Sequence, residues 1–332
     1  MEDVRVTVAA SRPDGRPSRR PPVASVAICA YTTHRWDDLR DAVASVLAQC
    51  RDGDECLVVI DHNDRLLALA ANEFAGEPVI RVIASGGSRG LSGARNTAIA
   101  MSRGDVIVFL DDDAVAGQGW LGRMVAELSR PGVYGVGSAA LPEWPDGQRP
   151  AWFPPEFDWV VGCSYLGQPT EPARVRNVFG VAMGFRRDVF ALAGQFSIDV
   201  GRIGVTPTGC EETELCIRLA QRRPDAVIRY LPDVAVTHRV AASRVRPGYF
   251  LRRCFGEGQS KARVSVLVGA DRALTTERAY IRRVLPKAFS RELRRFARGD
   301  LGGLAAATMM ALGLFIAGCG YVVVRVIGGT GA

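Results

Sequence analysis

The sequence lacks the short motifs that mark several common classes of enzyme. It has no GxxxxGK[S/T] loop, and no GxGxxG follows its first apolar run, so neither a P-loop nucleotidase nor a dinucleotide-dependent oxidoreductase is supported. Its eight cysteines contain no CxxC pair and are not grouped at the spacing of zinc ligands. Scattered single cysteines are typical of a reducing compartment, where they serve as small core residues. A zinc site is therefore not expected.

The N-terminal region lacks the apolar run of a signal peptide. Residues 11–22 read SRPDGRPSRRPP, and we expect residues 1–22 to form a disordered leader. The chain as a whole is 48% hydrophobic and 23% charged, which is typical of a folded protein, and its 332 residues suffice for one large domain or two smaller ones. Its net charge of +7 favours an anionic partner, such as a phosphate-bearing substrate, a membrane surface or nucleic acid.

Near the C-terminus, residues 301–324 contain no charged side chain, and about 20 apolar residues are enough to cross a bilayer. The alternative is a buried helix of the main domain, although such helices are usually shorter and apolar on one side only. Seven basic residues and one acid, Glu292, lie between residues 281 and 299, and basic residues beside a hydrophobic span favour the cytoplasmic side. We therefore expect a basic juxtamembrane helical region over 266–299 and a transmembrane or membrane-inserted helix over 300–326. The bulk of the chain would then lie on the cytoplasmic side of the cell membrane, while the glycines of the span leave a re-entrant or interfacial helix open.

Apolar runs alternate with amphipathic segments in the first third of the chain. Four β-branched runs predict strands and the segments between them predict helices: strands at 23–31, 56–60, 79–84 and 106–110, and helices at 36–50, 64–75 and 90–102. This alternation predicts an α/β fold with a mostly parallel central sheet and helices on both faces. Ligands of such sheets bind at the carboxyl ends of the strands, where Asp61 and Asp111–Asp113 lie.

Three consecutive carboxylates, Asp111, Asp112 and Asp113, follow the fourth predicted strand. Aspartates at a strand end often form only a solvated turn or a helix cap. Three together are costly, because each charge raises the cost of ionising the others. Mg²⁺ and Mn²⁺ bind carboxylate oxygens and bridge to phosphates, so the motif favours a metal site that holds a phosphate-bearing ligand.

The order of these segments resembles a known family. The sequence contains, in order, SVAICAYTTHR, VVIDHND, GLSGARNTAI, VIVFLDDDA, VFGVAMGFRRDVFALAGQF, GCEETELCIRL and IRYLPDVAVTH. Over residues 23–262 this pattern is similar to the family 2 glycosyltransferases with the GT-A fold, of the membrane-attached bacterial type. The resemblance implies a GT-A domain over 23–265, followed by the C-terminal hydrophobic helix. It also implies a metal-dependent, inverting transfer of a sugar from a nucleotide-diphosphate sugar to an acceptor hydroxyl.

The resemblance further implies roles for individual residues. Along the donor, Asp61 would read the base, Ala30, Tyr31 and Thr32 would lie along the nucleoside, and the segment from Gly90 through Arg95 to Asn96 would border the diphosphate and ribose. Asp111, Asp113 and His238 would hold Mg²⁺ or Mn²⁺, and Asp112 would face the ribose or the sugar. The Asp61 contact suits uracil, so a UDP-sugar is favoured, but it does not exclude guanine or thymine.

The catalytic base would come from an acidic pair, which in the family is usually Glu-Asp and here is Glu211-Glu212. We assign the base to Glu212, while the choice between the two glutamates stays open. Taken alone, these acids could form only the acidic first turn of a helix. Similarly, His238 could be a hydrogen-bonded strand end, and Arg95 could pair only with an acid at a helix end.

The acceptor is not named by the sequence: a glycan, a polyprenyl-linked acceptor or a small molecule would each fit. Residues 141–169 hold Trp144, Trp152 and Trp159, which form either a self-packed insertion or a wall of the acceptor cleft. Residues 243–262 are basic and aromatic, and we expect them to meet membrane lipid rather than nucleic acid. The alternative function is a catalytically inactive nucleotide-sugar-binding or membrane scaffold protein. Nucleotidyl transfer is disfavoured, because AYTTHRW after the first strand is not a glycine-rich loop.

Overall fold

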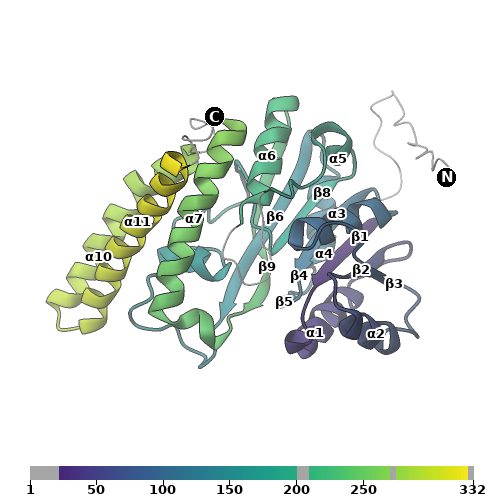
Figure 1. Cartoon of the computed structure of the whole chain (residues 1–332), viewed down its shortest axis with the longest axis horizontal. Coiled ribbons are helices and arrows are strands. Elements are labelled where there is room, and N and C mark those ends of the chain that lie inside the picture. Colours follow the sequence, from purple (N-terminus) through teal and green to yellow (C-terminus); the bar gives the residue numbers. More distant parts are fainter. Residues whose placement is uncertain (1–21, 200–208, 270–273, 328–332) are drawn as a thin grey trace.

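The computed structural model describes residues 22–199, 209–269 and 274–327, so the predicted leader lies almost entirely outside the described residues. Nine strands form one mixed sheet in the order β3-β2-β1-β4-β8-β6-β9-β5, with β7 paired to β9 (Figure 1). The strands are β1 (Ala24–Ala30), β2 (Glu55–Ile60), β3 (Ile80–Ala84), β4 (Val106–Asp111), β5 (Ala114–Ala116), β6 (Val133–Glu143), β7 (Ala173–Arg174), β8 (Ala182–Arg186) and β9 (Val227–Arg239).

The helices lie around this sheet and beyond one of its edges. They are α1 (Trp36–Leu47), α2 (Asp64–Glu73), α3 (Leu91–Met101), α4 (Trp120–Leu128), α5 (Asp188–Ala193), α6 (Glu211–Arg222), α7 (Pro247–Val268), α9 (Thr275–Ala279), α10 (Leu285–Ala297) and α11 (Leu301–Ile327). Short 3₁₀ segments are η1 (Thr33–Arg35), η2 (Pro155–Val161) and η3 (Ala242–Val245), and η4 (Tyr280–Val284) is a π-helical turn.

The first four strands confirm the predicted parallel sheet. β1 pairs in parallel with β2 and β4, and β2 pairs in parallel with β3. The second half of the sheet is mixed, since β8 runs antiparallel to both β4 and β6, while β6 and β9 are parallel. The sequence signals for parallel strands were confined to the first third of the chain, so they did not reveal this second half.

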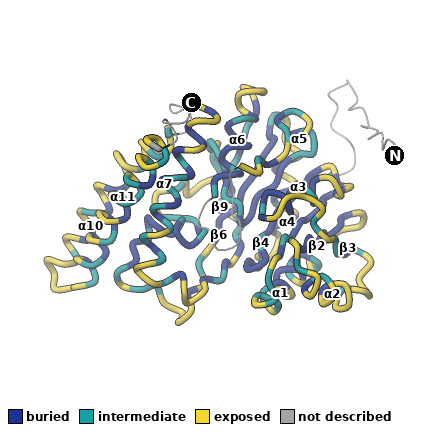
Figure 2. The backbone as a smooth tube through the Cα atoms, viewed as in Figure 1, coloured by how far each residue is buried: buried dark blue, intermediate teal, exposed yellow. Residues whose placement is uncertain are grey.

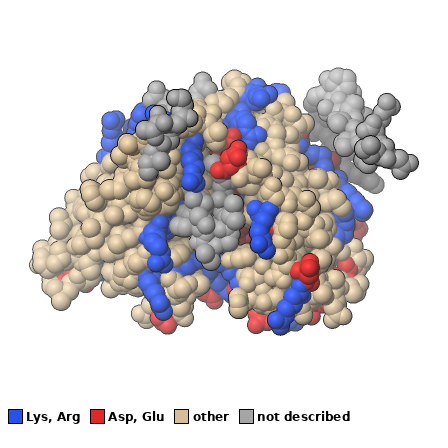
Figure 3. Space-filling model, in the orientation of Figure 1, with Lys and Arg blue, Asp and Glu red and all other residues tan. Residues whose placement is uncertain are grey.

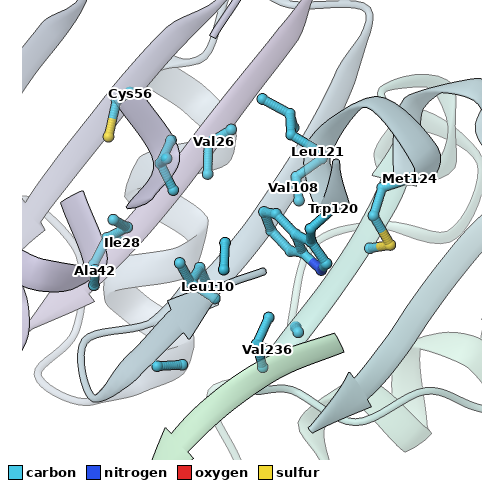
Figure 4. Close-up of a cluster of buried hydrophobic side chains, with 14 of the residues drawn as sticks. Val26, Ile28, Ala42, Cys56, Val108, Leu110, Trp120, Leu121, Met124 and Val236 are labelled. Atoms are coloured by element: carbon cyan, nitrogen blue, oxygen red, sulfur yellow. The ribbon is translucent and has the colours of Figure 1, made fainter. Parts of the chain in front are cut away.

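Alternate residues of the parallel strands pack on opposite faces, as expected for strands that are buried on both sides. On one face, Val26, Val108 and Leu110 pack with residues of α1, α2 and α4, including Trp120 (Figure 4). On the other face, Ala27 and Phe109 pack with residues of α3, α5 and α6. The prediction of helices on both faces is therefore confirmed, and Figure 2 shows the strands as the buried centre of the molecule.

A separate apolar core joins the C-terminal helices to the tryptophan-containing insertion. It includes Phe157 of η2, Phe250 of α7, Leu285 of α10 and Met310 of α11. α7, α10 and α11 lie side by side along one end of the molecule (Figure 1). Residues 301–326 form one helix that is long and apolar enough to cross a membrane, with a mean hydropathy of 2.0 in its most apolar window. The predicted boundary at residue 265 falls within α7, and the proposed domain limits stay predictions.

Candidate active site

The end of β4 carries the candidate metal site. Asp111 is the last residue of β4, and Asp113 immediately precedes β5. β5 pairs with β9 so that Ala114 lies opposite His238, which brings the His238 imidazole to the Asp113 carboxylate, with Nε2 3.0 Å from Oδ1. One ligand atom each from Asp111, Asp113 and His238 lie within 4.8 Å of one another. The structure thus brings together the three residues predicted to bind metal, and carboxylate oxygens are the donors preferred by Mg²⁺ and Mn²⁺.

Charge compensation explains how buried Asp113 is held. Burial alone would disfavour its charge, but His238 and two arginines hold the pKa of the Asp113 carboxyl well below its usual range. Arg35 lies 3.0 Å and Arg244 3.5 Å from Asp113 Oδ2. Burial likewise opposes a charged imidazole, yet the Asp113 carboxylate raises the pKa of His238 to about 10. A divalent cation bound here would take over the role of these positive groups.

Asp112 is also buried, and Arg35 donates to its Oδ1 at 2.8 Å. Its Oδ2 has no hydrogen-bond partner among the residues that the structure describes. Burial, followed by the neighbouring charge of Asp113, raises the pKa of Asp112 to about 7. Arg35 is a functional candidate that the sequence did not indicate. It is the last residue of η1, after the first strand, and only the fold shows that this segment approaches the aspartates.

Arg95 connects the metal site to the acidic pair. Its guanidinium donates to Glu211 Oε1 at 2.6 Å, to Asp111 Oδ1 at 3.2 Å and to the Gly180 carbonyl at 2.9 Å. Arg95 is almost completely buried, and its guanidinium lies over the ring of Phe109. The pairing with an acid at a helix end, one of the two interpretations of Arg95, is therefore present. This ion pair is compatible with the other interpretation, in which Arg95 lies beside the donor, because the Arg95 side chain also lines the cavity that contains Asp111.

The two adjacent glutamates open α6 and have different surroundings. Glu211 is buried and paired with Arg95, whereas Glu212 is half-buried and accepts a hydrogen bond from the Thr213 hydroxyl at 3.1 Å. Burial, followed by the charge of Glu211, raises the pKa of Glu212 to about 7. A carboxylate with a pKa near neutrality is well suited to act as a general base. The geometry thus favours Glu212 over Glu211 for that role.

The predicted nucleoside residues lie together at the carboxyl ends of β1 and β2. The Asp61 amide donates to the Ala30 carbonyl at 2.8 Å, and the Asp61 carboxylate accepts from the Gly90 amide at 2.9 Å. Gly90 has φ +117°, a conformation that favours glycine, and it precedes the first turn of α3. Tyr31 is exposed, and Thr32 caps η1 by accepting from the His34 amide.

The predicted nucleoside residues do not line the cavity that contains Asp111 and Arg95. In the described part of the chain, the wall of that cavity does not include Ala30, Tyr31, Thr32, Asp61 or Gly90. Asn96 exchanges two 2.9 Å hydrogen bonds with the backbone of Phe196, so its side chain anchors the segment after α5. A donor-binding role for Asn96 stays a prediction.

One cavity of about 850 Å³ contains the candidate chemistry. At one end its wall includes the metal-site residues, Arg95 and the two glutamates. From there it extends along α7 and α9 to α11, where Leu314, Ala317 and Tyr321 form part of the wall. Trp159 lines it too, whereas Trp152 packs against Phe153 and Phe250, and the role of these tryptophans in an acceptor wall stays a prediction.

Ion pairs between largely buried side chains line part of this cavity. Arg176 and Lys261 both reach Glu277 of α9 at 2.8 Å, and Arg253 reaches Glu257 at 2.9 Å. Arg253 and Lys261 both belong to the basic segment 243–262. In the fold these two cations line the cavity and do not form an outer surface. The sequence showed that these residues are charged but could not predict that they point into a cavity, because α7 does not have one polar and one apolar face.

Comparisons with known proteins identify the chain. Residues 25–192 match the family Glycosyl transferase family 2. The chain belongs to that family. A glucosyl-dolichyl phosphate glucuronosyltransferase of Haloferax volcanii is 30% identical over 244 residues, 73% of this chain and 77% of that protein. The pre-mycofactocin glycosyltransferase of Mycobacterium tuberculosis is 27% identical over 241 residues, 70% of this chain and 45% of that protein.

The fold is shared with a solved glycosyltransferase. A mannosyltransferase from Pyrobaculum calidifontis, in complex with GDP-Man and Mn²⁺, has a TM-score of 0.59 and 18% identity, and the likeness covers 93% of this chain and 90% of that one. The predicted GT-A fold is therefore confirmed. The chain is a glycosyltransferase enzyme of family 2 that uses nucleotide-sugar donors.

Proposed function

We propose that this glycosyltransferase transfers a sugar from a nucleotide-diphosphate sugar to a lipid-linked acceptor, with Mg²⁺ or Mn²⁺ and with inversion. A UDP-sugar is the favoured donor. The reaction would take place at the cytoplasmic face of the cell membrane. The observation that carries the proposal is the single cavity that joins an Asp-Asp-His site, a carboxylate of raised pKa and the apolar helix α11.

The donor would lie at the carboxyl ends of β1, β2 and β4, with its diphosphate at Asp111, Asp113 and His238. A divalent ion held by these residues would supply Lewis-acid stabilisation of the negative charge on the leaving diphosphate. The donor set of two carboxylates and one imidazole fits such an ion, and Arg95 holds Asp111 through a 3.2 Å hydrogen bond. The Mn²⁺ and GDP-Man in the mannosyltransferase complex support the same use of the fold.

Glu212 would act as the base. Its carboxylate takes the proton of the acceptor hydroxyl while the acceptor oxygen attacks the anomeric carbon and the bond from that carbon to the diphosphate oxygen breaks. One base on the face opposite the leaving group gives a single displacement, so the anomeric configuration inverts. Glu211 would instead hold Arg95 in place through its 2.6 Å ion pair.

A lipid-linked acceptor is favoured over a free glycan or a small molecule because α11 contributes apolar wall to the cavity. Trp159 and Tyr280 add aromatic surface in the same cavity, which suits a sugar ring or a hydrocarbon chain. The Haloferax relative is a glucosyl-dolichyl phosphate glucuronosyltransferase, which supports an acceptor of this class.

The test is a transfer assay with the full-length protein, a panel of UDP-, GDP- and TDP-sugars, and polyprenyl phosphate or a polyprenyl phosphate sugar as acceptor. Mass spectrometry would detect the glycosylated lipid. We expect product only with Mg²⁺ or Mn²⁺, and a loss of about 10²–10⁴-fold in Glu212→Gln. Transfer that persists in EDTA, or a product with retained anomeric configuration, would overturn the mechanism.

A further inference from the structure

The apolar helix α11 is covered by protein on one side only. Buried residues recur along α11 at helical spacing and include Ala306, Met310 and Gly313. The opposite side of the helix, which we call the open stripe, is exposed. The large hydrophobic side chains exposed on α11 include Leu301, Leu304, Leu312, Phe315, Val322 and Val326, and the exposed Arg325 lies only in its last turn. At about 1.5 Å per residue the helix is about 40 Å long, so this is an extended apolar surface. Figure 3 shows the visible face of α10 and α11 almost free of charged side chains.

The neighbouring helix α10 adds a basic and partly apolar surface. Leu293 and Phe296 are exposed on it, and so are Lys287, Arg294 and Arg298. Within the described residues, none of these three cations takes part in an ion pair. An amphipathic helix with exposed apolar residues and free cations is typical of segments that lie in the interface of an anionic membrane.

α11 packs closely against α7, a helix that carries charged side chains. A Cβ atom built on Gly258 of α7 would come within 1.9 Å of the Ala317 carbonyl oxygen, and one on Gly320 within 2.2 Å of the Phe255 carbonyl oxygen. α7 therefore lies directly on α11, and it carries Arg253 and Lys261 in the ion pairs of the cavity. If α11 crossed the hydrocarbon core, these charges would have to enter the bilayer as well, which is costly.

We infer that α10 and α11 together bind an anionic lipid bilayer, with α11 lying in the plane of the membrane surface instead of spanning it. The open apolar stripe of α11 enters the head-group boundary, and the cations of α10 meet anionic head groups. The inward stripe, with Leu314 and Ala317, simultaneously lines the catalytic cavity. The part of the cavity that α11 lines is thus about one helix diameter, about 10–12 Å, from the lipid. The inference rests on the membrane attachment proposed above and adds the orientation of the helix.

Vesicle binding of the full-length protein tests the surface without any assay of transfer. Leu312→Glu on α11 and Leu69→Glu on α2 form a matched pair, because these leucines are 41% and 40% exposed. On vesicles of phosphatidylcholine with phosphatidylglycerol, we expect Leu312→Glu to lower the partition coefficient by about tenfold or more and Leu69→Glu to leave it unchanged. Lys287→Gln and Arg294→Gln should each lower it about fivefold on these vesicles, and not on phosphatidylcholine alone.

Reporter fusions at the C-terminus test the orientation in a bacterial host. An in-plane helix leaves the C-terminus on the cytoplasmic side, so green fluorescent protein should fluoresce and alkaline phosphatase should stay inactive. An active phosphatase fusion would show a spanning helix and overturn the inference. Two other results would also overturn it: a folded protein, by circular dichroism, that binds no vesicles, or a dimer that Leu312→Glu converts to a monomer. Donor binding measured on the same samples reports on the proposed function separately.

Discussion

Glu211 and Glu212 show how two identical neighbouring side chains acquire different chemistry. Arg95 pairs with Glu211 at 2.6 Å and stabilises its charge, whereas Glu212 forms no ion pair with a described residue and accepts a hydrogen bond from the Thr213 hydroxyl. Burial and the neighbouring Glu211 charge then raise the pKa of Glu212 to about 7. The order of the pair in the sequence could not reveal this difference, because Arg95 lies far away along the chain, on α3.

The pKa of Glu212 predicts a pH dependence of the reaction. A base acts in its deprotonated form, so kcat should rise with pH and level off above about pH 7. At pH 5 it should be on the order of a hundredfold below the plateau, because only a small fraction of Glu212 is then ionised. The measurement is kcat from pH 5 to 9 at saturating donor and metal, with donor affinity determined at each pH. Glu212→Gln should be slow throughout and lack this rise, and an unchanged rise in that variant would assign it to another group.

At the scale of secondary-structure elements, the sequence predicted those whose signals are local. The first four strands and three helices lie within a few residues of their expected ranges, because β-branched runs and helical periodicity specify them. The union of Asp113 with His238 depends on the pairing of β5 with β9, which joins residues 125 positions apart. Only the resemblance to a family predicted that contact. By contrast, the positions of Asp61 and Asp111–Asp113 at the carboxyl ends of strands were predictable from the local apolar runs.

The packing of α11 on α7 gives a prediction for this pair of elements. Gly258→Ala places a methyl group against the Ala317 carbonyl and should force the helices apart, destabilising the protein by about 1–3 kcal/mol. Gly318→Ala is the control, because a Cβ atom there meets nothing within 4 Å, and alanine favours a helix by up to about 1 kcal/mol. Chemical denaturation of both variants in the same detergent measures the difference. Equal stabilities would mean that the close helix contact is absent.

At the scale of the whole molecule, composition and charge indicated an anionic partner and a membrane, and the fold shows how the two are related. The cavity extends from the strand ends to the inner stripe of α11, so the donor site and the apolar helix belong to one continuous surface. The sequence placed the basic segment 243–262 against lipid. In the fold, Arg253 and Lys261 of that segment line the cavity, and the exposed cations Lys287, Arg294 and Arg298 belong to α10, which packs against α11. Hydrophobicity alone predicts a long helix but not which of its sides the protein covers.

The most direct measurement is the thermal stability of the full-length protein with UDP-, GDP- and TDP-sugars, each with and without Mn²⁺. A ligand that binds only the native state raises its stability by mass action. We expect one nucleotide sugar to raise Tm only with the metal. Asp113→Asn should abolish this shift, Glu212→Gln should keep it, and so should the control Asp225→Asn, whose side chain is 68% exposed. If no nucleotide sugar gives a metal-dependent shift, or if Asp113→Asn retains it, the central claim of a metal-held donor at the end of β4 is contradicted.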